Sequence, residues 1–263
     1  MNSEIFVWHW HIEILLGLTV VQMLYLHLIG TFVSSNNTTE INPKEVISFT
    51  LGILLILICT VSPLHHIADN YLFSAHMLQH VFLTLMAPPL LILGIPGRVI
   101  DNLIKSKNQI FIFKKLLHPV TIFFVFNLVF SIWHMPVLYN LSVNNHYVHV
   151  FEHFTFILSA FAMWWPIFNK SKNLPRISYP TQMIYIFLLS VAQIIVFGII
   201  TFSNSPIYEF YAKAPKLWNL TPLIDQQIGG IIMKVGSAIL FMTIILKRFF
   251  DWYQNEERTS HLK

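Results

Sequence analysis

Long apolar runs, separated by short polar segments, dominate the chain. A helix that spans the hydrocarbon core of a bilayer needs roughly 20 apolar residues, and runs of about this length occur repeatedly. The pattern predicts an all-α fold, a polytopic membrane protein formed as a bundle of seven transmembrane helices, in one domain over residues 1–263. The predicted spans are Ile12–Val33, Val46–Leu64, Phe73–Ile95, Leu116–His134, Val148–Phe168, Met183–Phe202 and Ile228–Phe250.

The composition supports the same class. Hydrophobic residues make up 55% of the chain and charged residues only 11%, whereas about 25% charged residues is typical of a soluble domain. An ordinary soluble domain is therefore excluded. The single cysteine, Cys59, lies inside an apolar run, which excludes a disulfide framework, a CxxC motif and a zinc ribbon.

The basic residues are distributed unevenly between the two sets of connecting segments. One set holds 13 Lys and Arg residues, the other holds only Lys213 and Lys216, and Lys234 lies within the seventh run. Because Lys and Arg concentrate in cytoplasmic loops, the count places the N-terminus outside and the C-terminus in the cytoplasm. The net charge of +4 is thus a topology signal, and no nucleic-acid partner is expected. The 13 residues are Lys44, Arg98, Lys105, Lys107, Lys114, Lys115, Lys170, Lys172, Arg176, Lys247, Arg248, Arg258 and Lys263.

Proline and glycine mark special backbone positions within three of the runs. Pro119 suits the first turn of the fourth helix. The Pro88-Pro89 pair predicts a kink in the third helix, and Gly229-Gly230 predicts a close approach of the seventh helix to a neighbour.

Histidine is unusually abundant, with 13 residues against 12 Asp and Glu together. On the predicted topology, most of the histidines fall at or near the outer face. That group consists of His9, His11, His65, His66, His76, His80, His134, His146, His149 and His153.

Two histidine pairs with i,i+4 spacing start the third and fifth helices at this outer face. His76 and His80 form one pair, and His149 and His153 form the other, so each pair lies on one helical face. His134 ends the fourth helix nearby in the predicted topology. The pairs predict convergence on one cation, and neutral imidazole suits copper, zinc, iron and nickel.

Several other side chains are candidates for the surroundings of such a site. Met77 and Met135 adjoin the histidines, and their thioethers would favour cuprous copper. Glu152 and Asp225 are candidate ligands or acceptors that fix the histidine tautomers. Near the outer boundary of the seventh helix, Asp225 and Lys234 either pair with each other or border the histidine cavity and tune its charge; otherwise Lys234 extends to the interface.

Other interpretations of the histidines stay open. His9, His11, His65 and His66 are interpreted first as polar anchors at the membrane interface, and it remains open whether His9 and His11 join the site. Histidines on facing helices also ligate haem, although axial ligands usually come one from each helix. Interhelical hydrogen bonding without any metal is a third interpretation.

One motif of the fifth helix formally matches a zinc peptidase, but the match has low specificity. His149-x-x-Glu152-His153 matches the H-x-x-E-H pattern of one zinc peptidase group. Three fixed residues in five recur by chance in a histidine-rich chain, and no third ligand or substrate cleft is recognisable.

Several spaced motifs resemble the CtaG family of multi-span cytochrome c oxidase assembly factors, which is distinct from the single-span copper chaperone of the same name. The similarity runs over residues 51–242. It is carried by Phe73-Ser-Ala-His76-Met77-Leu-Gln-His80, Pro88-Pro89-Leu, Leu93-Gly94-x-Pro96, Trp133-His134-x-Pro136 with Tyr139, His149-x-x-Glu152-His153, Trp164-Trp165-Pro166 and Asp225-Gln226-Gln227-x-Gly229-Gly230-x-x-Met233.

The resemblance implies a non-enzymatic, multi-pass protein of the bacterial plasma membrane that is needed to make an active haem–copper oxidase. It implies copper as the bound metal, whereas the histidine pattern alone leaves haem or zinc as alternatives. The expected partners are a haem–copper oxidase subunit, other copper chaperones and the lipid bilayer. Carried over by motif, the metal-site residues are His76, His80, His134, His149 and His153, with Met77, Glu152, Asp225 and Met233 close by.

Overall fold

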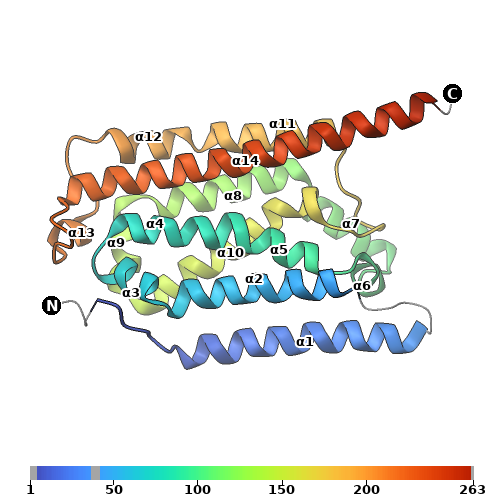
Figure 1. Ribbon diagram of the computed structural model, residues 1–263, viewed down its shortest axis with the longest axis horizontal. Coiled ribbons are helices and arrows are strands. Elements are labelled where there is room, and N and C mark those ends of the chain that lie inside the picture. The colour runs from blue at the N-terminus through green and yellow to red at the C-terminus, as the bar shows by residue number, and fades with distance from the viewer. Residues whose placement is uncertain (1–4, 37–41, 262–263) are drawn as a thin grey trace.

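The computed structural model describes residues 5–36 and 42–261, and within these ranges every regular element is a helix. The predicted all-α class is confirmed. The long helices run side by side, and the start of α1 and the end of α14 lie at opposite ends of the bundle (Figure 1). The elements are α1 (Ile12–Asn36), α2 (Pro43–Val61), α3 (Pro63–Asn70), α4 (Phe73–Val81), the π-helix η1 (Phe82–Met86), α5 (Ala87–Gly94), α6 (Gly97–Leu103), α7 (Lys107–Leu116), α8 (Pro119–Trp133), α9 (Pro136–Asn144), α10 (His146–Phe168), α11 (Tyr179–Ala192), α12 (Ile194–Phe202), α13 (Glu209–Lys213) and α14 (Pro222–His261).

The membrane spans agree with the apolar runs in the sequence. Six segments of the described chain are long and apolar enough to cross a bilayer, and the bent pair α7–α8 gives a seventh if it is counted as one span. This fourth span is the least regular, because α7 and α8 meet at 49°. α8 has 15 residues, about 22 Å of helix against a hydrocarbon core of about 30 Å. The six are Ile12–Thr31, Pro43–Val61, Phe73–Gly94, His146–Phe168, Tyr179–Phe202 and Pro222–Ser260.

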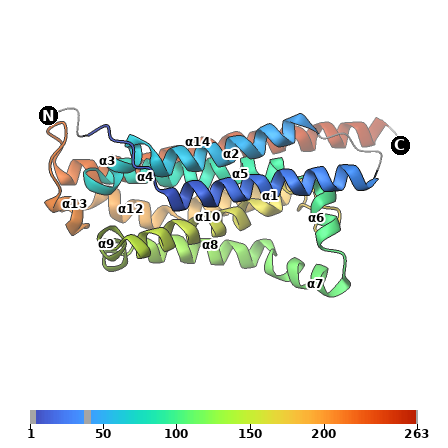
Figure 2. The same cartoon turned by 90° about the horizontal axis from the view of Figure 1, so that it is seen from below.

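The two ends of the bundle differ in charge. One end carries α6, α7 and the last turns of α14, and with them most of the Lys and Arg residues assigned to the cytoplasm (Figure 2). The other end carries α3, α9 and α13 (Figure 2). The assignment of the basic end to the cytoplasm stays a prediction from the count of Lys and Arg residues. One of the counted residues, Lys263, lies outside the described residues.

Helix starts follow from the sequence. Pro119 stands in the first turn of α8, as predicted, and the Nδ1 atom of His118 accepts a hydrogen bond from the backbone N–H of Val120. At the start of α10, the Asn145 side chain accepts hydrogen bonds from the N–H groups of the two residues after His146. This cap fixes where α10 begins, and it thereby sets the depth of the histidines in its first two turns.

The third span is irregular next to its proline pair, where a kink was predicted. The π-helix η1 directly precedes α5, which has Pro88 in its first turn. Since Pro88 has no N–H to donate to the Thr84 carbonyl four residues earlier, that carbonyl needs another donor. The indole Nε1 of Trp164 donates to it at 2.9 Å. A side chain of α10 thus stabilises the irregular turn of the third span.

The continuous segment α4–η1–α5 lies at the centre of the bundle, in contact with α2, α10 and α14 (Figure 1). The predicted close approach at Gly229 is confirmed. A Cβ atom added to Gly229 would lie 2.5 Å from Cδ1 of Phe73 in α4. One at Gly236, two turns further along α14, would lie 3.6 Å from Val81, which is ordinary contact.

We expect Gly229→Ala to lower the free energy of unfolding by about 1–3 kcal/mol, because the methyl group forces α4 and α14 apart. Gly236→Ala is the matched control. It adds the same methyl group to the same helix without a clash, and it gains the higher helix propensity of Ala. Thermal unfolding of the two detergent-solubilised variants measures the difference, and equal midpoints would contradict this account of the packing.

Candidate metal centre

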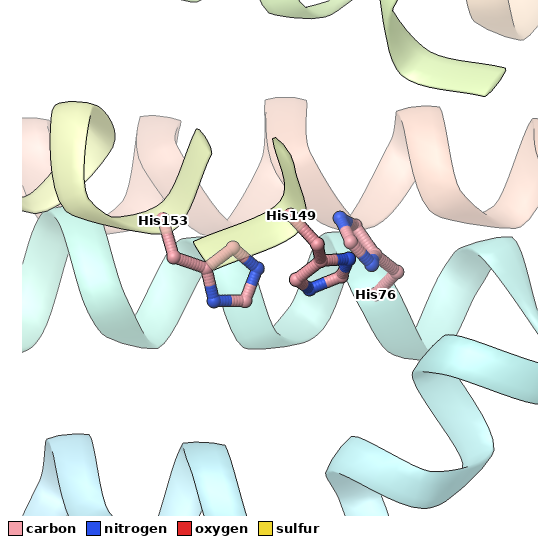
Figure 3. Close-up of side chains that lie close together, drawn as sticks. All are labelled: His76, His149 and His153. Carbon is pink, nitrogen blue, oxygen red and sulfur yellow. The ribbon is translucent and has the colours of Figure 1, made fainter. Parts of the chain in front are cut away.

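α4 and α10 bring the two predicted histidine pairs face to face. His76 and His80 are 0% and 4% exposed, and His149 and His153 are 8% exposed each. The ring centroids lie 4.4 Å apart within each pair. Between the helices they lie 5.5 Å apart for His76 and His149, and 5.3 Å apart for His80 and His153. Figure 3 shows His76 of α4 and the two α10 histidines with their rings in the space between the helices.

His134 joins the cluster from a third helix. It follows the last residue of α8, and its ring centroid lies 6.3 Å from that of His80. Its Nδ1 lies 2.7 Å from the Phe130 carbonyl oxygen. Because a carbonyl only accepts, Nδ1 carries the proton and Nε2 keeps its lone pair. The ring is buried, 6% exposed, and the neutral imidazole with a free Nε2 is the form that binds metals.

Two sets of three side chains place their ligand atoms close together in the described part of the chain. His76, His149 and His153 form one set, and His76, His80 and Glu152 form the other. Within each set, one ligand atom per residue lies within 4.8 Å of the other two. Metal–nitrogen bonds of about 2.0–2.1 Å separate the ligands of one ion by up to about 4 Å. Small side-chain adjustments would therefore bring either set onto one ion.

Glu152 lies among the histidines at the centre of the cluster. Its Oε1 lies 3.7 Å from Nε2 of His80 and 4.0 Å from Nε2 of His76, distances too long for hydrogen bonds. Those two Nε2 atoms are 2.7 Å apart. Either one imidazole donates a proton to the other, or both direct their lone pairs towards one cation. The fully buried carboxylate would offset part of that cation's charge.

Four buried ring nitrogens of the cluster have no hydrogen-bond partner among the described residues. An unpaired buried polar atom costs about 1–3 kcal/mol, and proteins rarely leave one unsatisfied. A group of four unpaired lone pairs or N–H groups is what a bound cation or ordered water would satisfy. The residues therefore fit a metal ion. The atoms are Nδ1 of His76 and Nε2 of His134, His149 and His153.

Asp225, a predicted neighbour of the site, orients the helix that carries His76. Its carboxylate accepts hydrogen bonds from the N–H groups of Phe73 and Ser74 at 2.7 and 3.1 Å, and from the Ser74 hydroxyl at 2.5 Å. It thus caps α4 from α14 and binds the unpaired N–H groups at the helix start. Of the alternatives left open for Lys234, an ion pair with Asp225 does not occur in the described part of the chain; Lys234 instead donates to the Ser190 carbonyl of α11 at 3.3 Å.

The methionines named from the sequence have separate positions. Met77 and Met233 are buried in an apolar cluster with Phe73, and Met233 also borders a cavity of about 20 Å³ next to His80. Met135 is 54% exposed. Met233 thus lies near His80 and Met77 packs in the adjoining apolar cluster, whereas Met135 lies on the surface.

Sequence reasoning missed a tyrosine group that closes the cluster on one side. Tyr139 packs edge-on against His76, with ring centroids 5.4 Å apart, and its hydroxyl donates to that of Tyr211 at 3.3 Å. Tyr211 donates to the Ala68 carbonyl, and Tyr208 to the His134 carbonyl. Only Tyr139 carried a signal, through the family motif. The others lie in or next to α13, whose side chains reach the site only through the fold.

The outer histidines, first interpreted as interface anchors, contact one another. Nε2 of His9 lies 2.9 Å from Nδ1 of His66, and the ring of His11 stacks on that of His146 with centroids 5.9 Å apart. Both pairs line a pocket that His149 also borders. A layer of histidines therefore covers the buried cluster at this end of the bundle.

A bundle of long apolar helices around a buried histidine cluster defines a polytopic membrane protein with a candidate metal centre. Residues 23–255 match the model of the cytochrome c oxidase caa3 assembly factor family (Caa3_CtaG). The chain belongs to this family, as its motifs indicated.

Curated relatives come from mycobacteria. An uncharacterized protein of Mycobacterium leprae is 24% identical over 95% of this chain and 40% of its own length. Uncharacterized proteins of Mycobacterium bovis and Mycobacterium tuberculosis are each 25% identical over 72% of this chain and 31% of theirs. The chain thus spans less than half the length of these relatives. No solved structure matches it.

Asp225→Ala is expected to destabilise the protein by about 1–3 kcal/mol, because it leaves buried N–H groups at the start of α4 unpaired. Glu209→Gln is the control, since Glu209 forms an exposed ion pair with Lys213 and such pairs contribute little. Thermal unfolding in detergent compares both variants with the parent protein. An unchanged midpoint for Asp225→Ala would show that this carboxylate does not hold α4.

Proposed function

We propose that the protein binds copper at the cluster of His76, His80, His134, His149 and His153 and helps to deliver it to a haem–copper oxidase. The observation that carries this proposal is the group of unpartnered, buried imidazole nitrogens contributed by three helices. The protein acts without catalysing a reaction, in the bacterial plasma membrane. Its partners are an oxidase subunit and the chaperones that supply the metal.

The donor set supports a borderline or soft transition metal. Neutral imidazoles suit copper and zinc. Among the divalent first-row metals, Cu²⁺ binds such sites most tightly. Cys59 is buried in another cluster, together with Phe49 and Ile53. Its thiol is therefore not a ligand of the proposed copper site. The oxidase that this family assembles contains copper, which favours copper over zinc.

A site that gives up its metal must also be reachable. His149 is shared between the buried cluster and a pocket of about 280 Å³ at the histidine-covered end of the bundle. An ion can therefore exchange at this end without unfolding the bundle. The apolar sides of the helices remain free to contact lipid and the transmembrane part of a partner.

Haem fits this arrangement less well than a compact ion. The five rings pack with neighbouring centroids only 4.4–6.3 Å apart, and the cavity beside His80 measures about 20 Å³. A porphyrin would have to displace most of these side chains. A Soret band in the purified protein would nevertheless establish the haem alternative at once.

Metal content tests the proposal directly. We expect the purified protein to retain copper, and His76→Ala and His149→Ala each to lower the affinity for copper by at least about tenfold, through the loss of an imidazole ligand. His27→Ala is the matched control, because His27 is exposed on α1. Copper is measured by mass spectrometry after dialysis against a weak chelator.

Equal copper in all four proteins would overturn the proposal, and zinc in place of copper would change the metal. If the parent protein retains no metal and the two variants only unfold at lower temperature, the histidines form interhelical hydrogen bonds instead.

A further inference from the structure

Beyond the buried cluster, a second group of metal-binding residues faces the pocket at the histidine-covered end. The pocket has a volume of about 280 Å³ and is lined by residues of the segment before α1, of α3 and of the start of α10. Asp69 is the carboxylate in its lining. The histidines around it are His9, His11, His65, His66, His146 and His149.

Asp69 presents one oxygen to a histidine on each side. Oδ2 lies 3.4 Å from Nε2 of His65, one turn earlier on α3. Oδ1 lies 3.7 Å from Nε2 of His149 on α10. Both Oδ1 and this Nε2 are buried and lack a hydrogen-bond partner in the described chain. A carboxylate oxygen and an imidazole nitrogen thus face each other without a proton donor assigned between them.

Gln79 fixes the tautomer of His65, which lies next to Oδ2 of Asp69. The side-chain amide of Gln79 donates to the Cys59 carbonyl at 2.8 Å, so its N–H₂ group also faces Nδ1 of His65, at 3.3 Å. Nδ1 of His65 therefore accepts, and Nε2 of the neutral ring carries the proton, 3.4 Å from Oδ2 of Asp69. The lone pair of His65 is thus engaged by Gln79, and His149 is the histidine that offers a free nitrogen to the carboxylate.

The segment before α1 forms one wall of the pocket. The backbone N–H of His9 donates to the Val61 carbonyl at the end of α2, and its ring contacts that of His66. His11 then stacks on His146 and meets His65 edge-on, with ring centroids 5.4 Å apart. Further imidazoles thus line the pocket around Asp69.

We propose that Asp69 and His149 form an outer site for a divalent cation of the copper class, which shares only His149 with the buried histidine cluster. An ion with bonds of about 2.0–2.2 Å to both atoms holds them roughly 3–4 Å apart, which matches the observed separation. Water in the pocket completes the coordination, since its volume exceeds the roughly 30 Å³ that one water molecule occupies in the liquid. The mixed oxygen and nitrogen ligands suit a divalent ion.

His149 connects this outer site to the buried cluster, in which it lies near His76 and His153. An ion that exchanges its bond to Asp69 for one to His76 moves inward while it stays bound to His149. This role as a first stop rests on the proposed function of the buried cluster. The existence of the outer site does not, and the two are tested separately.

The test uses Cu²⁺ as the probe and the full-length protein in detergent. The double variant His80→Ala/His153→Ala removes two ligands of the buried cluster and leaves Asp69 and His149 in place. We expect this protein to bind Cu²⁺ with an electron paramagnetic resonance spectrum of mixed nitrogen and oxygen coordination. Adding Asp69→Asn should lower the affinity about 10- to 100-fold. Adding Glu13→Gln, which removes an equal charge beside His11, should not.

Asp69→Asn alone, in the otherwise unchanged protein, covers the case in which the double variant does not fold. It should remove the oxygen-coordinated Cu²⁺ signal and leave the all-nitrogen signal. The outer site is overturned if Asp69→Asn and Glu13→Gln have the same effect, or if the folded double variant binds no Cu²⁺. If the parent protein shows the oxygen-coordinated Cu²⁺ signal but no all-nitrogen signal, the buried copper site is overturned and the outer site stands.

Discussion

The contact of two imidazole pairs across α4 and α10 is the arrangement on which the other features of this site depend. Imidazole nitrogens at the centre of an apolar bundle lose their water, and several of them gain no protein partner. At about 1–3 kcal/mol for each unpaired atom, the cluster costs stability unless a cation or ordered water occupies it. Its neighbours are arranged to hold the rings in place against this cost.

Those neighbours act on the backbone of the helices that carry the histidines. Asp225 caps α4 from α14, and the backbone carbonyl of Phe130 fixes the tautomer of His134. Trp164 satisfies the carbonyl that Pro88 leaves unpaired in the third span. Asp225 and Trp164 bind polar groups of a neighbouring span, whereas the bond between His134 and Phe130 lies within one helix end. Hydrogen bonds between spans thus hold the helix that carries His76 and His80 in place.

The two proposed sites differ in chemistry in a way that suits transfer. The outer one combines a carboxylate with imidazole beside a pocket, where water can complete the shell of a divalent ion. The inner one offers several buried imidazoles, with the buried Glu152 carboxylate close by. His149 belongs to both, so an ion need not dissociate fully between them. Delivery to an oxidase would follow the same steps in reverse.

The sequence by itself determined the helical class, the spans and the pairing of histidines, because the length of an apolar run and the i,i+4 spacing are local properties. Its motifs also determined the family. It did not determine that Asp225 caps a helix, that Met135 lies on the surface or that Asp69 meets His149. These depend on which side chains meet when distant spans pack. Asp69 lies on a short helix with no periodic signal, and its partner is 80 residues away along the chain, so only the tertiary structure brings them together.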